Sequence, residues 1–194
     1  MSTIDPMKVQ IILAGIGGQG VLFSSRVFSE LALQLGLNVM GSETHGMSQR
    51  GGSVIAHLKL GQFQSPLIRR GTADILYSFE KNETYRTLKF LREGGLCFVN
   101  QESGDAFDRK VLSYLKKKNI SIQAYDATQA ALRIGSILAA NIVLIGYSVG
   151  TGLVPFKHKE LTKVLELVSK KKNLVVNLRA FELGFREGKL GKRL

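Results

Sequence analysis

Blocks of apolar residues alternate with amphipathic stretches along this chain, and each kind of block predicts a different element. Residues 8–15, KVQIILAG, form a continuous apolar run bounded by glycine, which is typical of a strand buried on both faces of a parallel sheet. Between residues 19 and 35 the apolar positions recur near helical spacing, and Gly36 follows as a C′ glycine that ends the helix. The start of the chain therefore predicts a strand, a turn and a helix.

The same alternation continues to the end of the chain, through short connections and without a low-complexity linker. Strands that alternate with helices in this way predict a three-layer α/β/α sandwich on a mostly parallel, Rossmann-like sheet. A chain of 194 residues can bury one sizeable core, so we expect a single domain over residues 1–194. The further strands are expected at residues 37–41, 53–61, 73–80, 94–100 and 120–126, and the further helices at residues 82–91, 105–118, 127–134, 137–146, 156–170 and 174–186.

Composition narrows the class of protein. The chain is 44% hydrophobic and has one cysteine, Cys97, which excludes an internal disulfide and any cluster or zinc site built on several cysteines. Cys97 stands in the apolar run GGLCFVN and is expected in a strand core rather than as a nucleophile. No apolar stretch reaches the roughly 20 residues that cross a bilayer, and the N-terminus lacks the regions of a signal peptide. We therefore expect a cytoplasmic protein without a membrane partner.

The formal net charge of +12 is compatible with nucleic acid, acidic partners or anionic ligands. Two lysine runs, 116–118 and 170–172, are predicted to close helices, where cations complement the helix macrodipole. No aromatic-rich strand of the RNA-reading type and no helix-turn-helix pattern accompanies them, so we expect no nucleic-acid partner. An acidic protein partner or an anionic ligand explains the charge better, with solubility as the alternative.

A glycine-rich turn, GIGGQG, joins the first predicted strand to the first helix. Gly15, Gly17 and Gly20 match the G-x-G-x-x-G fingerprint, in which glycines allow a tight turn, close approach to a ligand and close packing of helix on strand. Gly18 and Gln19 complete the turn, and the helix that follows offers unpaired N–H groups to an anion. The turn is compatible with a nicotinamide or flavin site, and also with a packing or interface turn that holds no ligand.

A second glycine-rich loop, within SETHGMSQRGGSV (residues 42–54), begins where the second predicted strand ends. Glu43 is close to where a dinucleotide site needs an acidic residue, roughly twenty residues after the first turn. The rest of the loop is unlike a ribose-binding turn, because its polar residues are held among glycines and can approach another surface closely. Arg50 could present its guanidinium fork to a carboxylate or phosphate, or pair with Glu43 and only order the loop. The candidate residues of this loop are Glu43, His45, Gln49, Arg50, Gly51 and Gly52.

The three histidines differ in what they suggest. His45 could act as a proton carrier or a polar contact, or be a hydrogen-bonded histidine in a turn. His57 and His158 are widely separated and lack the spacing of metal ligands, so we expect no metal site.

The motifs AGIGGQGV, SETHGMSQRGGSV, SPLI and ADILYSFE together resemble the gamma-subunit family of the 2-oxoacid ferredoxin oxidoreductases, which act on pyruvate, ketoisovalerate and 2-oxoglutarate. The resemblance is specific over residues 8–100. It continues weakly through residues 139–146, where Asn141 and Gly146 fit the family's asparagine-and-glycine helix, and beyond Gly152 only length and composition agree. The residues THGMSQ favour the branch of the small (beta) subunits of indolepyruvate or aryl-pyruvate ferredoxin oxidoreductases.

The resemblance implies a division of labour between subunits. Thiamine diphosphate, Mg and [4Fe-4S] clusters would belong to a large catalytic partner subunit, which decarboxylates a 2-oxoacid oxidatively with coenzyme A and passes electrons to ferredoxin. This chain would carry no catalytic residue and no cofactor, and would be inactive alone. A single cysteine agrees with that, because it cannot hold a four-cysteine cluster. The two glycine-rich loops would then be ligand or subunit-interface loops, and a homodimer of the isolated chain stays open.

Two other classes of function remain open at this point. One is a self-contained NAD(P)- or flavin-binding Rossmann oxidoreductase, which the first glycine-rich turn favours. The other is a non-catalytic nucleic-acid or regulatory module that uses the basic surface.

Overall fold

The computed structural model describes residues 4–5, 7–45, 51–102 and 107–191. One mixed sheet of six strands forms its centre, in the order β2-β3-β1-β4-β5-β6. Strands β1, β4, β5 and β6 run parallel to one another, whereas β3 is antiparallel to both of its neighbours, β1 and β2. The mostly parallel sheet expected from the sequence is thereby confirmed. The strands are β1 (Val9–Ile16), β2 (Val39–His45), β3 (Ser53–Leu60), β4 (Ala73–Ser78), β5 (Leu91–Asn100) and β6 (Ser121–Tyr125).

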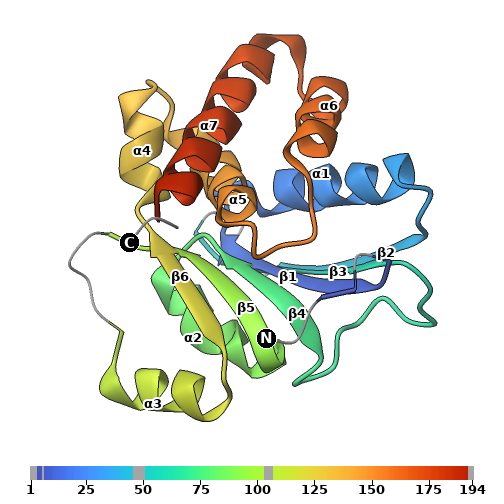
Figure 1. The fold of residues 1–194 in the computed structure, drawn as a ribbon, viewed down its shortest axis with the longest axis vertical. Helices are drawn as coiled ribbons and strands as arrows, with labels where there is room; N and C mark the ends of the chain where they lie inside the picture. Colours follow the sequence, from blue (N-terminus) through green and yellow to red (C-terminus); the bar gives the residue numbers. More distant parts are fainter. Residues whose placement is uncertain (1–3, 6, 46–50, 103–106, 192–194) are drawn as a thin grey trace.

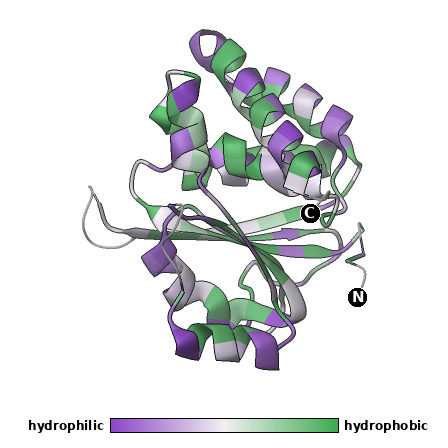
Figure 2. Cartoon of the chain, turned by 60° about the vertical axis from the view of Figure 1, so that its left-hand side comes forward, coloured by the Kyte–Doolittle hydropathy of each residue, from purple (hydrophilic) through white to green (hydrophobic). Residues whose placement is uncertain are grey.

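Helices cover both faces of this sheet, as the alternating sequence pattern predicts (Figure 1). Figure 2 views the sheet nearly edge-on between the two helical layers. The larger layer consists of α1 (Val21–Gln34), α4 (Ala127–Arg133), α5 (Ala140–Thr151), α6 (His158–Val168) and α7 (Lys171–Leu190). The smaller layer consists of α2 (Lys81–Thr87) and α3 (Arg109–Lys117). Two short 3-10 turns, η1 (Leu88–Phe90) and η2 (Ile137–Ala139), precede β5 and α5.

Strand β2 differs from the sequence-based expectation in its length and its place. It was expected to end at residue 41, but it continues to His45, because each of its residues pairs with one of β3 as far as His45↔Val54. An edge strand tolerates polar side chains that face solvent, so the polar stretch after Gly41 did not end it. The start of SETHGMSQRGG is therefore strand, and the connection from β2 leads into a hairpin with β3 rather than into a helix.

Successive side chains of the strands point to opposite faces of the sheet and form two hydrophobic cores, one between the sheet and each helical layer. The larger core centres on Tyr77, whose ring packs against Phe28 and Phe98 and whose hydroxyl lies 2.8 Å from the Ser148 hydroxyl. Cys97 is fully buried in the smaller core, which confirms it as a strand core residue. Burial raises the pKa of the Cys97 thiol far above its usual range.

Four glycines bring helices α5 and α7 into direct backbone contact. Gly146 and Gly150 lie on α5, and Gly184 and Gly188 lie on α7, with four-residue spacing on each helix. A Cβ atom on Gly146 would collide with the carbonyl oxygen of Phe181, and a Cβ atom on any of the other three would collide with facing backbone in the same way. Glycine is therefore required at this crossing, because any larger residue would force the helices apart. The C-terminal segment, which sequence reasoning could not assign a role, closes the larger layer through this contact.

Candidate functional site

The two glycine-rich loops meet at the carboxyl end of β1. The Gly17 N–H donates a hydrogen bond to the Gly52 carbonyl oxygen at 2.9 Å, just beyond the last pair of the β1–β3 ladder, Ile16↔Ser53. The loop tips remain accessible, since Gly17, Gly18 and Gly51 are exposed. In open α/β sheets, ligands bind outside the carboxyl ends of the strands, which is where these tips lie.

Inside the first turn, the space that two of its glycines leave is filled by the chain's own side chains. Gln19 accepts a hydrogen bond from the Ile16 N–H at its Oε1 atom (2.9 Å), and a Cβ atom on Gly15 would lie 2.8 Å from that oxygen. Gly20 has a φ of +79° and would place a Cβ atom 2.5 Å from Nδ2 of Asn141. These two glycines therefore serve internal packing on the side where a Cβ atom would lie, while the tip of the turn is exposed.

Asn141 fixes the start of α1 from a distant part of the chain. Its Nδ2 atom lies 3.2 Å from the Gly20 carbonyl oxygen and 2.9 Å from the Ser24 hydroxyl, and the side chain is buried. Its resemblance to a family position was the only sequence signal for this role, because the two segments are more than a hundred residues apart.

Glu43 and His45 lie on β2, at the edge of the sheet. Strand β3 separates β2 from β1, so Glu43 is not on the strand next to the first glycine turn. A Rossmann site needs its acidic residue on that neighbouring strand to reach the ribose of a bound dinucleotide. Glu43 is instead exposed at the sheet edge, which removes the support that it gave to the dinucleotide interpretation. Gln49 and Arg50 lie outside the described residues, so their roles stay predictions.

Glu83 holds the start of β3, just after the second glycine-rich loop, and sequence reasoning missed it. The Ser53 hydroxyl donates to Oε2 of Glu83 at 2.6 Å, while Arg86 contacts the other carboxylate oxygen at 3.1 Å. Glu83 is 3% exposed, so its hydrogen bonds replace water as partners. Glu83 lies in the first turn of α2, where acidic residues are common because they complement the helix macrodipole. No sequence signal therefore pointed to its contact with Ser53.

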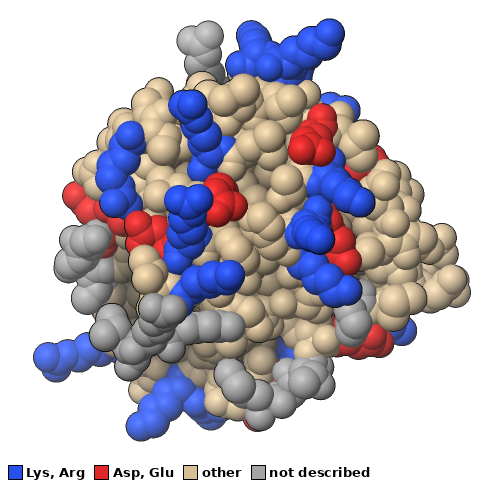
Figure 3. Space-filling model, turned by 45° about the horizontal axis from the view of Figure 1, so that its top comes forward, with Lys and Arg blue, Asp and Glu red and all other residues tan. Residues whose placement is uncertain are grey.

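A cavity of about 420 Å³ adjoins the first glycine turn. Gly20 and Asn141 line it, and so do the cationic residues Arg26, Lys170 and Lys172. The three cations are exposed, and no ion pair with a carboxylate holds any of them within the described part of the chain. We call this cavity the cationic groove. Figure 3 brings this helical side of the molecule forward and shows Lys and Arg side chains spread across it.

The lysines of the cationic groove correct one expectation from the sequence. Helix α6 ends at Val168, so Lys170, Lys171 and Lys172 do not close it but open α7, with Lys170 at the N-cap. Cations at the positive end of a helix macrodipole are unfavourable, so the macrodipole does not explain this run. It does explain the other run, because Lys116 and Lys117 lie in the last turn of α3. Local rules broken in this way are typical of functional sites.

A second cavity, of about 280 Å³, shares Leu138 and Asn141 with the cationic groove. Asn100 lines it, and the Nδ2 atom of Asn100 donates to the Thr128 hydroxyl at 2.8 Å. Gly18 and Ile137 line it as well, and Ile137 and Leu138 are 53% and 76% exposed. Apolar side chains thus stand in solvent beside the open tip of the first turn, as expected of a surface that another molecule covers.

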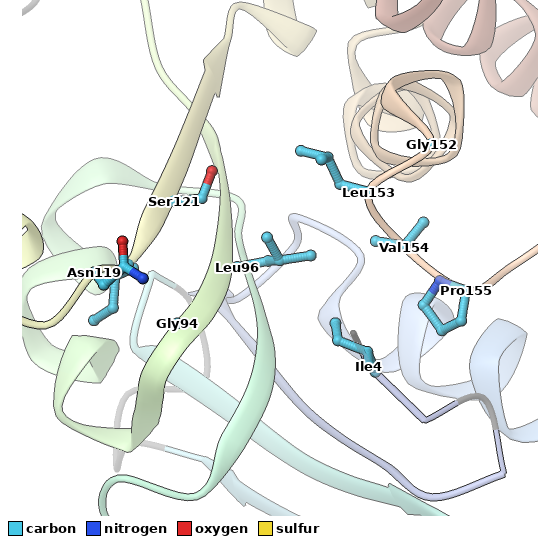
Figure 4. A pocket seen from close by; sticks show the side chains of 10 residues that line it. Ile4, Gly94, Leu96, Asn119, Ser121, Gly152, Leu153, Val154 and Pro155 are labelled. Carbon is cyan, nitrogen blue, oxygen red and sulfur yellow. The ribbon is translucent and has the colours of Figure 1, made fainter. Parts of the chain in front are cut away.

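A further cavity, of about 460 Å³, lies elsewhere (Figure 4). Leu153, Val154 and Pro155 of the α5–α6 connection face Leu96 of β5 across it, and Ser121 marks the amino end of β6. It is a largely apolar groove at the amino end of β6, at the other end of the sheet from the glycine-rich turns. It therefore does not contribute to the site at the carboxyl ends of the strands.

The described residues hold no group of three or more His, Cys, Asp or Glu side chains arranged as a metal site. His57 is buried, and its Nδ1 atom accepts a hydrogen bond from the Ile68 N–H at 3.2 Å. Burial, and then the charge of Lys59, lower the pKa of His57. His158 lies 2.9 Å from a carboxylate oxygen of Glu182. Among the helices of the described chain, none is long and apolar enough to cross a membrane.

The fold and the site define the class of the protein: a six-stranded α/β domain whose two glycine-rich segments meet at the carboxyl end of β1. The chain belongs to the Pyruvate ferredoxin/flavodoxin oxidoreductase family, whose profile matches residues 10–187. This confirms the resemblance found in the sequence and extends it into α7.

Curated relatives and solved structures agree with this assignment. The chain is 33% identical to indolepyruvate oxidoreductase subunit IorB of Archaeoglobus fulgidus, over 96% of this chain and 98% of that one. It is 35% identical to the subunit of the same name in Thermococcus kodakarensis, over 94% and 96%. The keto/oxoacid ferredoxin oxidoreductase gamma subunit of Geobacter sulfurreducens shares the fold with a TM-score of 0.71 at 23% identity, over 94% of this chain and 99% of that one. These relatives are subunits of oxidoreductase complexes.

Proposed function

We propose that this chain is the small subunit of a 2-oxoacid ferredoxin oxidoreductase that acts on indolepyruvate or another aryl-pyruvate. A large partner subunit carries thiamine diphosphate, Mg and the [4Fe-4S] clusters, and ferredoxin accepts the electrons. Coenzyme A takes up the acyl group. The similarity to two subunits named for indolepyruvate, at 33% and 35% identity over nearly the whole chain, supports this substrate over pyruvate or 2-oxoglutarate.

The cationic groove is the observation that supports a role for this chain itself, which is to bind coenzyme A. Coenzyme A is a polyanion, and cations that lack carboxylate partners attract phosphate groups. Arg26, Lys170 and Lys172 surround a cavity that adjoins the first glycine turn, at the end of the sheet where α/β proteins bind ligands. We infer that the groove holds phosphates of coenzyme A, while the exposed tips at Gly17, Gly18 and Gly51 face the large subunit.

The exposed apolar residues beside the turn support the same orientation. Ile137 and Leu138 stand in solvent next to Gly18, and apolar side chains at such positions are usually covered in an assembly. With the large subunit seated here, the thiol end of a coenzyme A molecule held in the groove would point toward the partner's active centre.

Reconstitution tests this function directly. The chain is purified alone and together with its large subunit, and the reduction of ferredoxin is followed with indolepyruvate, pyruvate and 2-oxoglutarate, each with and without coenzyme A. We expect the isolated chain to be colourless and inactive, and the complex to prefer the aryl-pyruvate and to require coenzyme A. A coloured isolated chain, turnover without a partner, or micromolar binding of NAD(H), NADP(H), FAD or FMN would contradict the proposal.

A further inference from the structure

A second group of cationic side chains lies on the face of the sheet opposite the cationic groove. Lys59 of β3 points to the face that α2 and α3 cover, because His57, two residues earlier on the strand, packs edge-to-face against Phe90 beside the smaller core. The connection from β3 to β4 reaches the same core through Ile68. The function proposed for the groove uses none of these residues.

Two ammonium groups on this face share one aromatic ring. The Nζ atoms of Lys8 and Lys59 each lie 5.1 Å from the centroid of the Phe63 ring. A cation over such a ring is attracted by its electrons, but the ring has no net charge. Phe63 therefore brings two positive charges together without neutralising them.

Arg69 brings a third charge to the same region. It follows Ile68, whose N–H donates a hydrogen bond to Nδ1 of His57 at 3.2 Å, two residues before Lys59. Burial, and then the charge of Arg69, lower the pKa of Lys59, so the two cations repel each other. The cations of this region, which we call the basic cluster, are Lys8, Lys59 and Arg69.

No carboxylate within the described ranges forms an ion pair with a member of the basic cluster. Asp74 on β4 accepts hydrogen bonds from Nε of Arg92 at 2.7 Å and from the Gln10 N–H at 2.8 Å instead. A lysine is almost never buried unless it is paired, yet Lys59 is only 8% exposed. Lys59 therefore lacks the anionic partner that a buried lysine normally has.

The ammonium group of Lys59 still has an opening to solvent. Among the described residues, the side-chain N and O atoms that are fully enclosed without a hydrogen-bond partner are Oε1 of Gln101 and the hydroxyl of Tyr125. Nζ of Lys59 has no hydrogen-bond partner either, and it is not one of these enclosed atoms. Its stem is thus buried while a small ligand can reach its charge. Lys8 and Arg69 are exposed and can turn toward such a ligand.

We propose that the basic cluster binds a phosphate group, either as inorganic phosphate or as the monoester of a small molecule. A phosphate monoester carries roughly −1.5 to −2 charges at pH 7 and has three strong acceptor oxygens, so it can pair with all three cations. Arginine binds phosphate with its guanidinium fork, and lysine binds it as a point charge. A single carboxylate has one charge and would leave most of the cluster uncompensated.

Nuclear magnetic resonance of the purified full chain tests this site, with the ring signals of His57 as the local reporter. The chain has 3 histidines, and His57→Gln identifies the signal by its loss. Inorganic phosphate, acetate and chloride are titrated at fixed pH and constant ionic strength. We expect phosphate to shift the His57 signal saturably, because a bound anion offsets the nearby charge of Lys59. Acetate and chloride should produce no saturable shift.

Variants that remove one charge each locate the site. Lys8→Gln, Lys59→Gln and Arg69→Gln should each raise the phosphate dissociation constant about tenfold or more, because a charge-assisted contact is lost. Lys117→Gln on α3 is the matched control, and Lys172→Gln removes a charge from the cationic groove. Neither should change the His57 titration. The variants of the exposed Lys8 and Arg69 decide if Lys59→Gln fails to fold.

The same titration separates the two sources of phosphate. Glycerol 3-phosphate that binds more tightly than inorganic phosphate would assign the site to phosphate esters, whereas inorganic phosphate that binds at least as tightly would assign it to the free ion. A shift that does not saturate, acetate that binds as tightly as phosphate, cluster variants that match Lys117→Gln, or a loss of the shift in Lys172→Gln would overturn the proposal.

Discussion

The Gly17 amide nitrogen lies 2.9 Å from the Gly52 carbonyl oxygen, and this hydrogen bond joins two loops that the sequence separates by more than twenty residues. It exists because the antiparallel strand β3 delivers Gly52 to the carboxyl end of β1. The glycines at the tips thus form one exposed surface, and the side chains of Gln19, Asn141 and Glu83 hold that surface from within.

The first turn should depend on glycine at position 20 more strongly than at position 18. Both residues have positive φ, but only Gly20 packs against Asn141. Gly18→Ala should cost about 1 to 2 kcal/mol of unfolding free energy through backbone strain, and Gly20→Ala about 2 to 4 kcal/mol because the clash is added. Urea denaturation of both variants measures the difference. Equal losses would show that Asn141 does not restrict the turn.

The glycine crossing of α5 and α7 should not accept a methyl group. Gly184→Ala would place a Cβ atom against the backbone of Val143 and should destabilise the chain by about 3 kcal/mol, because neither helix can yield without separating from the other. Gly191→Ala is the matched control, since the nearest atom to its Cβ position is the Tyr147 hydroxyl oxygen at 3.8 Å. Its effect should stay within about 0.5 kcal/mol. Similar melting temperatures for the two variants would be inconsistent with a close-packed crossing.

Cys97 should resist thiol reagents in the folded chain. Its sulfur is fully buried in β5, and burial raises the pKa of the thiol, so it stays protonated through neutral and mildly basic pH. We expect no reaction with a disulfide reagent at pH 8 on the time scale of minutes, and one thiol per chain after unfolding in urea. Rapid labelling of the native chain would mean that β5 opens.

His57 should make the fold sensitive to mild acid. Burial lowers its pKa in the folded chain below the ordinary histidine value of 6.5, so the unfolded chain binds the proton more readily. The stability that neutral His57 provides is fully present above pH 6.5 and declines as the pH falls below it, by at most about 1.4 kcal/mol per pH unit. Urea titrations at pH 7.5 and 5.5 should show this loss in the natural chain and a smaller one in His57→Gln. An unchanged loss in the variant would assign the effect to another group.

Local sequence patterns predicted most of the strands and helices, and the arrangement of a sheet between two helical layers. Apolar runs, helical periodicity and Gly36 located β1 and α1, and residue 36 has the left-handed conformation expected of a C′ glycine. These signals do not say which strands become neighbours. The place of β3 between β2 and β1, and with it the loss of Glu43 as a ribose ligand, depends on pairing across the chain.

The candidate site was predicted in part. The sequence identified the two glycine-rich segments, but Ser53–Glu83 and Gly20–Asn141 join residues far apart along the chain, and no periodicity encodes such contacts. The lysines at 170–172 were assigned to the wrong helix end, because the pattern could not locate the break after Val168. Correcting that assignment is what links them to the groove.

A coenzyme A titration of the reconstituted complex tests the central claim most directly. Arg26→Ala and Lys172→Ala each remove one charge from the cationic groove, and Lys117→Ala, on the opposite helical layer, is the control. If the groove holds the phosphates, each groove variant should lose about 1.5 to 3 kcal/mol of coenzyme A binding, roughly a tenfold to hundredfold rise in its KM, with the KM for the oxoacid unchanged. Groove variants that match Lys117→Ala would contradict the claim.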